Sequence, residues 1–322
     1  MDKLVAMLRA AGDPTRLRLL LLLREAELAV SELIEIVGQS QPRVSRHLKL
    51  LGEAGLLERF KEGSWVFYRA ADQGKGADLG RALAALADPA LIETDRARLT
   101  HVREARAAAA AAYFKANAAE WERIRALHAP DKDVEAAILR RLTARPIEEL
   151  LDAGTGTGRM LELLAPYAKR AVGIDVSPEM LAIARDRLAR EKLSRVQVRL
   201  GDIYRLPFSG GTRETGFDTV LFHQVLHYLD DPGAAVAEAA RVMRPGGRLA
   251  IADFAPHGLE FLRDDYAHRR LGFSDREVRG WFEAAHLKQG ESETIAPADH
   301  KGTADKLTVK LWFATSKSKE AT

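Results

Sequence analysis

The chain has 322 residues, enough for two domains at the usual size of roughly 100 to 200 residues each. Hydrophobic residues make up 47% and charged residues 30%, which is typical of a globular protein and excludes a disordered or fibrous chain. The net charge is only +3, so partners have to be inferred from local charge, and the absence of cysteine excludes disulfides, thiolate metal sites and cysteine nucleophiles.

No segment is typical of a membrane span or a secretion signal. The longest aliphatic run, Leu19 to Leu23, is far shorter than the ~18 apolar residues that cross a bilayer. The N-terminal residues begin on a helical pattern and lack the ordered cationic, apolar and small-residue segments of a signal peptide. The sequence therefore predicts a cytoplasmic protein without membrane contact.

The first 55 residues follow a helix, turn, helix pattern. Asp13 and Pro14 supply an N-cap and a first helical residue. Ser31 is expected to cap the next helix and Gly38 to end it. Residues 41–55 carry apolar side chains at helical spacing, which predicts a further helix directly after the turn.

Two strand-like runs follow, Leu56 to Phe60 and Trp65 to Arg69, and the glycine-containing turn Lys61 to Ser64 joins them. A hairpin directly behind the second helix of such a pair is a wing. The local charge agrees, because residues 39–69 hold six basic and three acidic side chains. A winged helix-turn-helix domain is predicted.

From Gly76 to His128 the composition shifts to alanine, including the run Ala107 to Ala112, so this segment is strongly helical. Two interpretations remain open: a helical linker, or a dimerisation helix followed by a helix that leads onto the next domain. A regulator that reads two DNA half-sites needs a homodimer. The expected domains are residues 1–90 for DNA binding and dimerisation, residues 91–128 for the linker, and residues 129–322 for a second folded domain, which is described next.

Beyond Glu148, short apolar strands alternate with helical patterns, which predicts a doubly wound α/β sheet of the Rossmann-like kind. Ser274 and Glu277 form a capping box for one more helix, and Leu307 to Ala314 is expected to close the sheet as a late strand. The other expected strands are Leu150 to Ala153, Ala171 to Asp175, Val196 to Leu200, Asp218 to Phe222 and Arg248 to Phe254.

A glycine-rich turn follows the first of these strands, at Gly154, Gly156 and Gly158. Glycine allows positive φ and lets the backbone come close to a ligand. The dinucleotide fingerprint requires glycine at position 159, which is Arg159. Asp152, just before the turn, would repel a pyrophosphate but suits a ligand with an ammonium group.

Further residues follow at fixed places. Asp175 ends the second strand, where a carboxylate can accept both ribose hydroxyls. Met180 is placed to lie against an adenine, and Asp202 to accept its amino group. Together with the turn, this order predicts S-adenosylmethionine binding, with S-adenosylhomocysteine as bound product or effector.

On these residues, Glu148 to Phe254 resembles the class I methyltransferase fold of small-molecule methyltransferases. The resemblance implies that Asp152 contacts the methionine part of the cofactor, Asp175 the ribose, and Asp202 with Ile203 the adenine. The predicted cofactor residues are Tyr113, Asp152, Ala153, Gly154, Thr155, Gly156, Gly158, Asp175, Val176, Met180, Asp202 and Ile203.

The segment from Tyr113 and Phe114 to Ala118 and Trp121 resembles the aromatic lid that these enzymes fold over the cofactor; plain helix packing is the alternative. His223 and His227, after the fourth strand, are four apart and are expected to share a helix face. Either is a candidate catalytic base for a small-molecule methyl acceptor. Structural histidines are the competing interpretation.

Residues 10–69 resemble the ArsR-type winged-helix repressors, through GDPTRLR at 12–18 and QPRVSRHLK at 41–49, the latter matching their recognition helix. A solvated helix face is the competing interpretation, and His47 lies nearer the core edge. The residues expected to contact double-stranded operator DNA are Gln41, Arg43, Ser45, Arg46, His47, Lys49, Lys61 and Ser64.

The metal-sensing members of that family carry a Cys-x-Cys box, but the corresponding stretch, Glu27 to Leu33, has none. We therefore predict no metal site. Arsenite methylation is also excluded, because the enzymes that perform it hold arsenic with cysteines. Two hypotheses remain: a working methyltransferase fused to its own regulator, or a non-catalytic repressor that responds to S-adenosylmethionine or S-adenosylhomocysteine.

Overall fold

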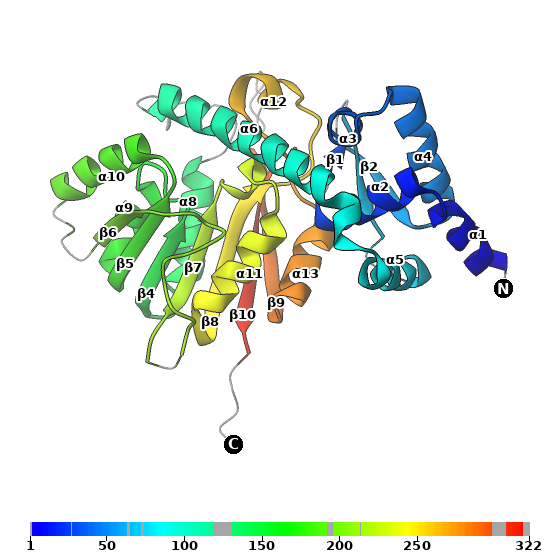
Figure 1. The fold of residues 1–322 in the computed structure, drawn as a ribbon. Coiled ribbons are helices and arrows are strands. Elements are labelled where there is room, and N and C mark those ends of the chain that lie inside the picture. The colour runs from blue at the N-terminus through cyan, green and yellow to red at the C-terminus, as the bar shows by residue number, and fades with distance from the viewer. Residues whose placement is uncertain are drawn as a thin grey trace. The chain divides into compact units, whose positions relative to one another are not determined.

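The computed structural model describes residues 2–26, 28–62, 65–71, 74–118, 131–191, 193, 196–212, 214–297 and 307–317. The chain divides into two compact units, Met1–Ala108 and Ala109–Thr322 (Figure 1). The division falls within one long helix, α6 (Glu93–Asn117). Among the described residues, no helix has the length and apolar character needed to cross a membrane.

The N-terminal unit sets helices around a three-stranded antiparallel sheet of order β1-β3-β2. Its elements are α1 (Asp2–Ala11), α2 (Pro14–Glu25), β1 (Leu28–Ala29), α3 (Val30–Val37), α4 (Gln41–Glu53), β2 (Leu57–Glu62), β3 (Trp65–Ala70), α5 (Gly74–Leu86), a 3-10 helix (Pro89–Ile92) and the start of α6. The predicted helix, turn, helix and hairpin are confirmed.

The ends of the helices follow local chemistry. The Asp13 carboxylate accepts an N–H of the first turn of α2 at 3.0 Å, as expected of its N-cap. Gly38 ends α3 with φ 68°. The prediction that Ser31 caps α3 is wrong, because the N-cap is Ala29, whose N–H donates to the Glu32 carboxylate at 2.8 Å.

The core of the N-terminal unit holds most of the leucines of α2, α3 and α4 together with Leu99 and Val102 of α6. A partly buried ion pair connects α2 and α6. Arg18 donates from Nε and Nη2 to the two carboxylate oxygens of Asp95 at 2.6 Å each, and Asp95 is 1% exposed. The first turn of α6 is therefore fixed to α2 by a paired, two-point contact.

The C-terminal unit is built on one seven-stranded sheet of order β6-β5-β4-β7-β8-β10-β9. The strands β4 to β8 run parallel in that sheet. Its elements are α8 (Asp131–Leu142), β4 (Ile147–Ala153), α9 (Arg159–Leu164), β5 (Ala168–Asp175), α10 (Pro178–Arg190), β6 (Val196–Leu200), β7 (Phe217–His223), α11 (Pro232–Val242), β8 (Met243–Phe254), α12 (Phe261–Tyr266), α13 (Asp275–Ala284), β9 (Leu287–Ile295) and β10 (Val309–Ser316).

Alternate residues of β8 supply two cores. Leu249 and Ile251 pack with apolar residues of α11 and α13, whereas Ala250 and Ala252 pack with those of α8 and α9. A strand whose side chains are buried on both faces belongs to a sheet covered on both sides. The predicted doubly wound α/β fold is confirmed.

The far edge of the sheet differs from the prediction. The late strand, β10, does not close the sheet but lies between β8 and β9, antiparallel to both. The edge strand β9 was not predicted, because its sequence LKQGESETI is polar except at its ends. An edge strand has one unpaired side and exposed side chains, so it lacks the apolar signal of a buried strand.

Candidate functional site

The predicted cofactor residues, apart from Tyr113 on α6, lie at or just after the carboxyl ends of β4, β5 and β6. From β4 the chain steps to β5 and β6 on one side and then crosses to β7 and β8 on the other side of β4, so the strand order reverses at this point. In open α/β sheets, ligands bind at such a switch point, outside the carboxyl ends of the strands. The sequence motifs thus lie at the switch point of the sheet.

The glycine turn after β4 takes a conformation that other residues rarely adopt. Gly154, Gly156 and Gly158 have φ values of 79°, 52° and 78°. A Cβ added at Gly154 would lie 2.4 Å from a methyl group of Val225, which belongs to the loop after β7. The turn is thus in direct contact with that loop, and glycine is the residue that fits.

Two carboxylates border the turn. Asp152 is 1% exposed and accepts the Thr155 hydroxyl at 2.6 Å. Asp175 accepts the N–H of Gly156 at 2.8 Å and that of Ser177 at 2.9 Å, which ties the turn to the end of β5. Burial raises the pKa of the Asp175 carboxyl, and these N–H groups oppose the rise.

Two further features lie at the ends of β5 and β6. Val176 is 57% exposed, whereas Met180 is 2% exposed, so Val176 offers the larger apolar surface to a ligand. Asp202 is exposed and accepts the N–H of Tyr204 at 2.8 Å, while the neighbouring Ile203 is buried. Ala153, the last residue of β4, is also buried.

These residues fit S-adenosylmethionine. Three carboxylates lie at the carboxyl ends of three neighbouring strands, so an ammonium group, ribose hydroxyls and an adenine amino group would each find an acceptor. The glycine turn leaves the backbone open to a ligand beside Asp152. A pyrophosphate would instead meet that buried carboxylate, so the donor set disfavours a dinucleotide.

The histidines after β7 do not share a helix face, so that prediction is wrong. His223 ends β7, and His227 lies in a 3-10 helix of three residues (Leu226–Tyr228). Between them Gln224 has φ 50°, which interrupts any helix, and its N–H donates to the Ala252 carbonyl at 2.8 Å. The two histidines therefore belong to different elements.

His227 has a partner that the sequence analysis missed. Its Nδ1 lies 2.7 Å from Oδ1 of Asp253 in β8, and the side chains of the two are 2% and 0% exposed. A charged residue inside the apolar strand Leu249 to Phe254 was the available signal, because a buried carboxylate needs hydrogen-bond partners.

Of the predicted lid residues, Tyr113 and Phe114 lie on the last turns of α6, which belong to the C-terminal unit. The Phe114 ring is 4.8 Å from that of Tyr228, and the Tyr113 ring is 6.5 Å from that of Tyr266. Burial raises the pKa of Tyr113 to about 12, so its hydroxyl stays protonated at neutral pH. Ala118 is buried, and Trp121 lies outside the described residues.

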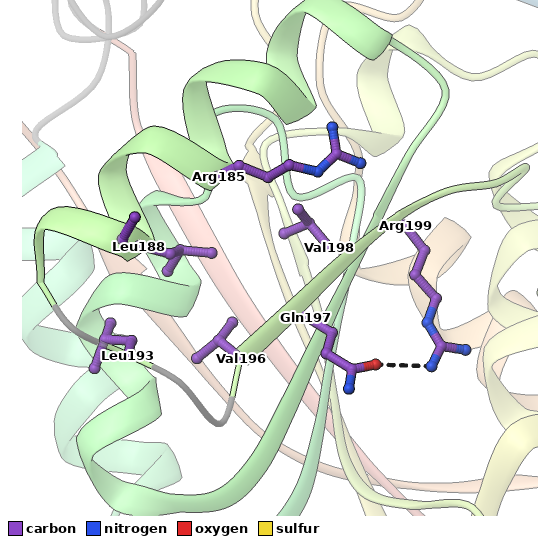
Figure 2. A pocket seen from close by; sticks show the side chains of 8 residues that line it. Arg185, Leu188, Leu193, Val196, Gln197, Val198 and Arg199 are labelled. Atoms are coloured by element: carbon purple, nitrogen blue, oxygen red, sulfur yellow. Dashed lines mark hydrogen bonds between the residues drawn. The ribbon is translucent and has the colours of Figure 1, made fainter.

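A separate groove of about 660 Å³ lies between α10 and the edge strand β6 (Figure 2). Its walls are mainly aliphatic, and Arg199 donates to Gln197 at 2.7 Å on its rim. It is lined by Arg185, Leu188, Ala189, Leu193, Val196, Gln197, Val198 and Arg199. None of the predicted site residues is among them.

In the N-terminal unit, α4 presents the predicted DNA-contacting residues to solvent. Val44, Leu48 and Leu51 are buried in the core. His47 is half-buried, with Nδ1 3.9 Å from the Asp13 carboxylate, which favours its structural role. The exposed residues are Gln41, Arg43, Ser45, Arg46 and Lys49.

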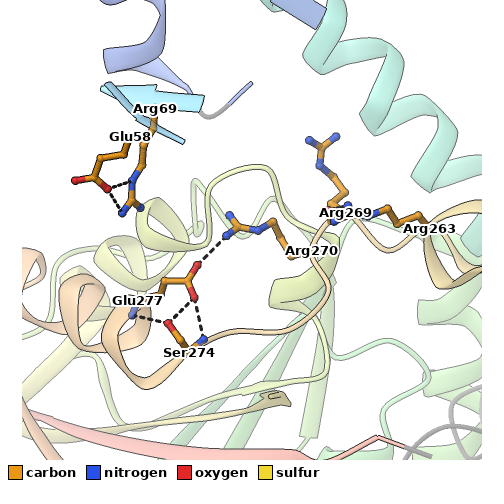
Figure 3. A network of polar contacts seen from close by, with 7 residues as sticks. All are labelled: Glu58, Arg69, Arg263, Arg269, Arg270, Ser274 and Glu277. Carbon is orange, nitrogen blue, oxygen red and sulfur yellow. Dashed lines mark hydrogen bonds and ion pairs between the residues drawn. The ribbon is translucent and has the colours of Figure 1, made fainter. Parts of the chain in front are cut away.

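The wing gives less detail. Ser64 lies outside the described residues, and Lys61 is placed only by its backbone in β2. Farther along the hairpin, Arg69 donates from Nε and Nη2 to Glu58 at 3.1 and 2.8 Å (Figure 3). This pair neutralises one of the basic side chains of the region, and on α4 Lys49 lies 3.8 Å from Glu53.

Comparison with known proteins agrees with both units. Residues 13–59 match the family model described as bacterial regulatory protein, arsR family, and residues 151–251 match the methyltransferase domain. The structure resembles a chain from the complex between the Haloferax volcanii Trm112 methyltransferase activator and a methyltransferase, with TM-score 0.52 and 26% identity, covering 63% of this chain and 97% of that one.

Three curated relatives match part of the chain. The malonyl-[acyl-carrier protein] O-methyltransferase of Serratia marcescens is 33% identical over 48% of this chain and 56% of its own length. The demethylmenaquinone methyltransferase of Tropheryma whipplei (strain Twist) is 36% identical over 37% of this chain and 46% of its own length. An uncharacterized 37.1 kDa protein in transposon TN4556 of Streptomyces fradiae is 42% identical over 38% of this chain and 34% of its own length.

The chain thus spans between a third and somewhat over half of the length of these relatives. It joins an ArsR-type DNA-binding helix-turn-helix to a methyltransferase domain of the class I fold.

Proposed function

We propose that the chain is a transcriptional regulator whose C-terminal unit binds S-adenosylmethionine and transfers its methyl group to a small molecule. The observation that carries this proposal is the constellation after β4, in which a turn with three positive-φ glycines lies between the Asp152 and Asp175 carboxylates. The names of the Serratia and Tropheryma relatives support a small-molecule acceptor or one carried on a protein arm.

Each part of the site has a role in binding. In this proposal Asp152 neutralises the ammonium group, Asp175 accepts the ribose hydroxyls, and Asp202 with Val176 holds the adenine. The bound cofactor supplies a methyl group on a sulfonium, and the protein contributes mainly by holding the acceptor in line with it. Tyr113 and Phe114 are placed to exclude water from the site.

Calorimetry on the purified full-length protein with S-adenosylmethionine and with S-adenosylhomocysteine tests the proposal. Losing a hydrogen-bonded carboxylate typically costs about 1.5 to 3 kcal/mol, so Asp175→Ala should bind about 10- to 150-fold more weakly. Asp186→Ala, at an exposed position on α10, is the matched control and should bind like the wild type. Equal affinities for both variants would remove Asp175 from the site.

We also propose that the N-terminal unit binds double-stranded operator DNA as a homodimer. Three apolar side chains of α1 support dimerisation, since Leu4, Val5 and Leu8 are 46%, 39% and 46% exposed. Neighbouring exposed apolar groups on a helix commonly mark an interface. Sedimentation equilibrium of the full chain should give twice the 35.5 kDa mass, and a monomer would contradict the proposal.

A further inference from the structure

The loop after β7 is a second part of the site, distinct from the cofactor residues. It begins at Gln224, whose φ of 50° is uncommon for a residue with a side chain. Such strained positions concentrate at functional sites. Val225 of the same loop fills the space beside Gly154, so the loop packs on the turn that borders the methyl donor.

Within this loop, Asp253 holds His227 in one orientation. The carboxylate accepts the N–H groups of Leu226 at 3.0 Å and of Phe254 at 2.8 Å, besides meeting Nδ1 of His227 at 2.7 Å. An ionised carboxylate is an acceptor only, so Nδ1 is the donor of this pair, and in the neutral imidazole Nε2 then keeps its lone pair. The imidazole is thus in the tautomer that can accept a proton at Nε2.

The Nε2 atom of His227 is buried and has no hydrogen-bond partner among the described residues. The same holds for the amide nitrogen of Gln224 and the hydroxyl of Tyr113. Buried polar atoms are almost always hydrogen-bonded, so unsatisfied ones indicate a missing ligand or water. Three of them occur on this loop and on the helix that packs against it.

The walls around these groups are aromatic. The rings of Tyr228 and His268 lie 4.1 and 4.2 Å from the His227 ring, and Phe114 packs on Tyr228 at 4.8 Å. Flat unsaturated molecules stack favourably on such rings.

The nearby arginines are already paired. Arg269 and Arg270 donate backbone N–H groups to the His227 carbonyl, and the Arg269 side chain contacts Asp230 at 2.7 Å. The Arg270 side chain contacts Glu277 at 2.9 Å (Figure 3). A carboxylate acceptor would therefore find no uncommitted guanidinium on this segment.

We propose that this loop is the acceptor subsite and that the acceptor is a flat molecule with a weakly acidic hydroxyl, a phenol or an enol, whose proton is taken by Nε2 of His227. This inference rests on the proposed function. In the step, the acceptor oxygen loses its proton to Nε2 and gains the methyl group, whose bond to sulfur breaks with both electrons left on the sulfur. The imidazolium then returns its proton to water. Asp253 is a positioning residue for His227.

The first experiment reads the histidine directly. Two-dimensional ¹⁵N NMR of the full-length protein with bound S-adenosylhomocysteine should show His227 protonated at Nδ1 with a bare Nε2. Adding 2-naphthol should shift the Nε2 resonance, and adding benzoate should not. In Asp253→Asn, the NH2 group of the new amide would face either a backbone N–H group or the N–H at Nδ1 of His227, so two donors would meet. The tautomer with a bare Nε2 should therefore be lost. A proton on Nε2 in the wild type, or no shift with naphthol, overturns the proposal.

The second experiment measures transfer from trideuteromethyl-labelled S-adenosylmethionine to 2-naphthol, catechol, a naphthohydroquinone, benzoate and benzylamine, by mass spectrometry. We expect labelled ethers from the hydroxyl acceptors alone. His227→Asn keeps a donor toward Asp253 but has no base, so kcat should fall about 10²- to 10⁴-fold with KM nearly unchanged. His286→Asn, at an exposed position with φ 57° that asparagine tolerates, is the matched control.

The outcomes separate the two proposals. Calorimetry with S-adenosylhomocysteine should give the same affinity for the wild type, His227→Asn and His286→Asn. The acceptor inference is overturned if cofactor affinity is unchanged but methyl transfer occurs only to the amine or the carboxylate, or to none of the five probes. This result would leave the proposed cofactor site standing. Loss of cofactor affinity in His227→Asn alone would assign the histidine a structural role.

Discussion

Replacing Gly154 with alanine tests the contact on which the whole site depends. Alanine at φ 79° costs about 1 to 2 kcal/mol of backbone strain. Its Cβ would also lie 2.4 Å from Val225 Cγ2 and 2.9 Å from Val225 Cβ, well inside the ~3.5 Å separation of touching carbon atoms. Overpacking of this kind typically costs about 1 to 3 kcal/mol more. The free energy of unfolding of the C-terminal unit should therefore fall by about 2 to 5 kcal/mol.

The same substitution elsewhere gives a matched control with the opposite sign. Gly280 lies on the exposed face of α13, and a Cβ there would meet no atom within 4 Å. Alanine in a helix interior is more stable than glycine by about 0.5 to 1 kcal/mol, so Gly280→Ala should stabilise the unit slightly.

Thermal and urea unfolding of both variants, with calorimetry against S-adenosylhomocysteine, provides the measurement. At roughly 2 to 4 °C per kcal/mol for a domain of this size, Gly154→Ala should melt at least several degrees below the wild type and bind the cofactor weakly. Gly280→Ala should melt at or above the wild-type temperature and bind normally. A Gly154→Ala protein with wild-type melting and affinity would refute the packing argument.

Three further predictions concern the rest of the chain. Arg46→Ala should weaken operator binding by about 1 to 3 kcal/mol and relax its specificity, whereas Lys49→Ala should lower the slope of log affinity against log salt by about one; fluorescence anisotropy at several salt concentrations separates the two. Glu238→Gln should lower the free energy of unfolding by about 1 kcal/mol at neutral pH, because hydrogen bonds from Arg241 lower the pKa of that carboxyl. A carboxyl whose pKa is lowered by folding stabilises the folded state at pH values above its unfolded pKa of ~4.3, and this contribution is lost as the carboxyl becomes protonated. The difference in urea unfolding between wild type and variant should therefore vanish as the pH falls below about 4. Finally, S-adenosylmethionine or S-adenosylhomocysteine should change operator affinity about 5- to 150-fold, and operator DNA should change the affinity for that ligand by the same factor; calorimetry with and without operator that shows no change in either direction would contradict the coupling.

Much of the fold was predictable because its signals are local. Asp13 as an N-cap, glycines at the ends of helices and the apolar runs of β4 to β8 each depend on a few neighbouring residues. The edge strand β9 was missed, since its alternation is weak and an edge is half solvated. The position of β10 between β8 and β9 is set by long-range pairing, which no local pattern encodes.

The same division holds at the site. The glycine turn and Asp175 follow from spacing within one chain segment. The pairing of His227 with Asp253 joins residues 26 apart in the sequence. Position 224 has a positive φ, for which glycine or asparagine would be expected, but it is occupied by glutamine, so the sequence does not indicate this conformation. The helix that sequence spacing suggested for the histidines is excluded by that one backbone conformation.

The helix α6 gives the predicted coupling a physical basis. In the N-terminal unit its first turn is fixed by the partly buried pair of Asp95 with Arg18. In the C-terminal unit its last turns place Phe114 against Tyr228, in the loop that carries His227. A helix transmits displacement along its axis far better than a flexible tether of glycine and serine does. If α6 stays one continuous helix in solution, we predict that a ligand which reorders the loop after β7 also changes operator affinity, and that operator DNA changes the affinity for that ligand by the same factor.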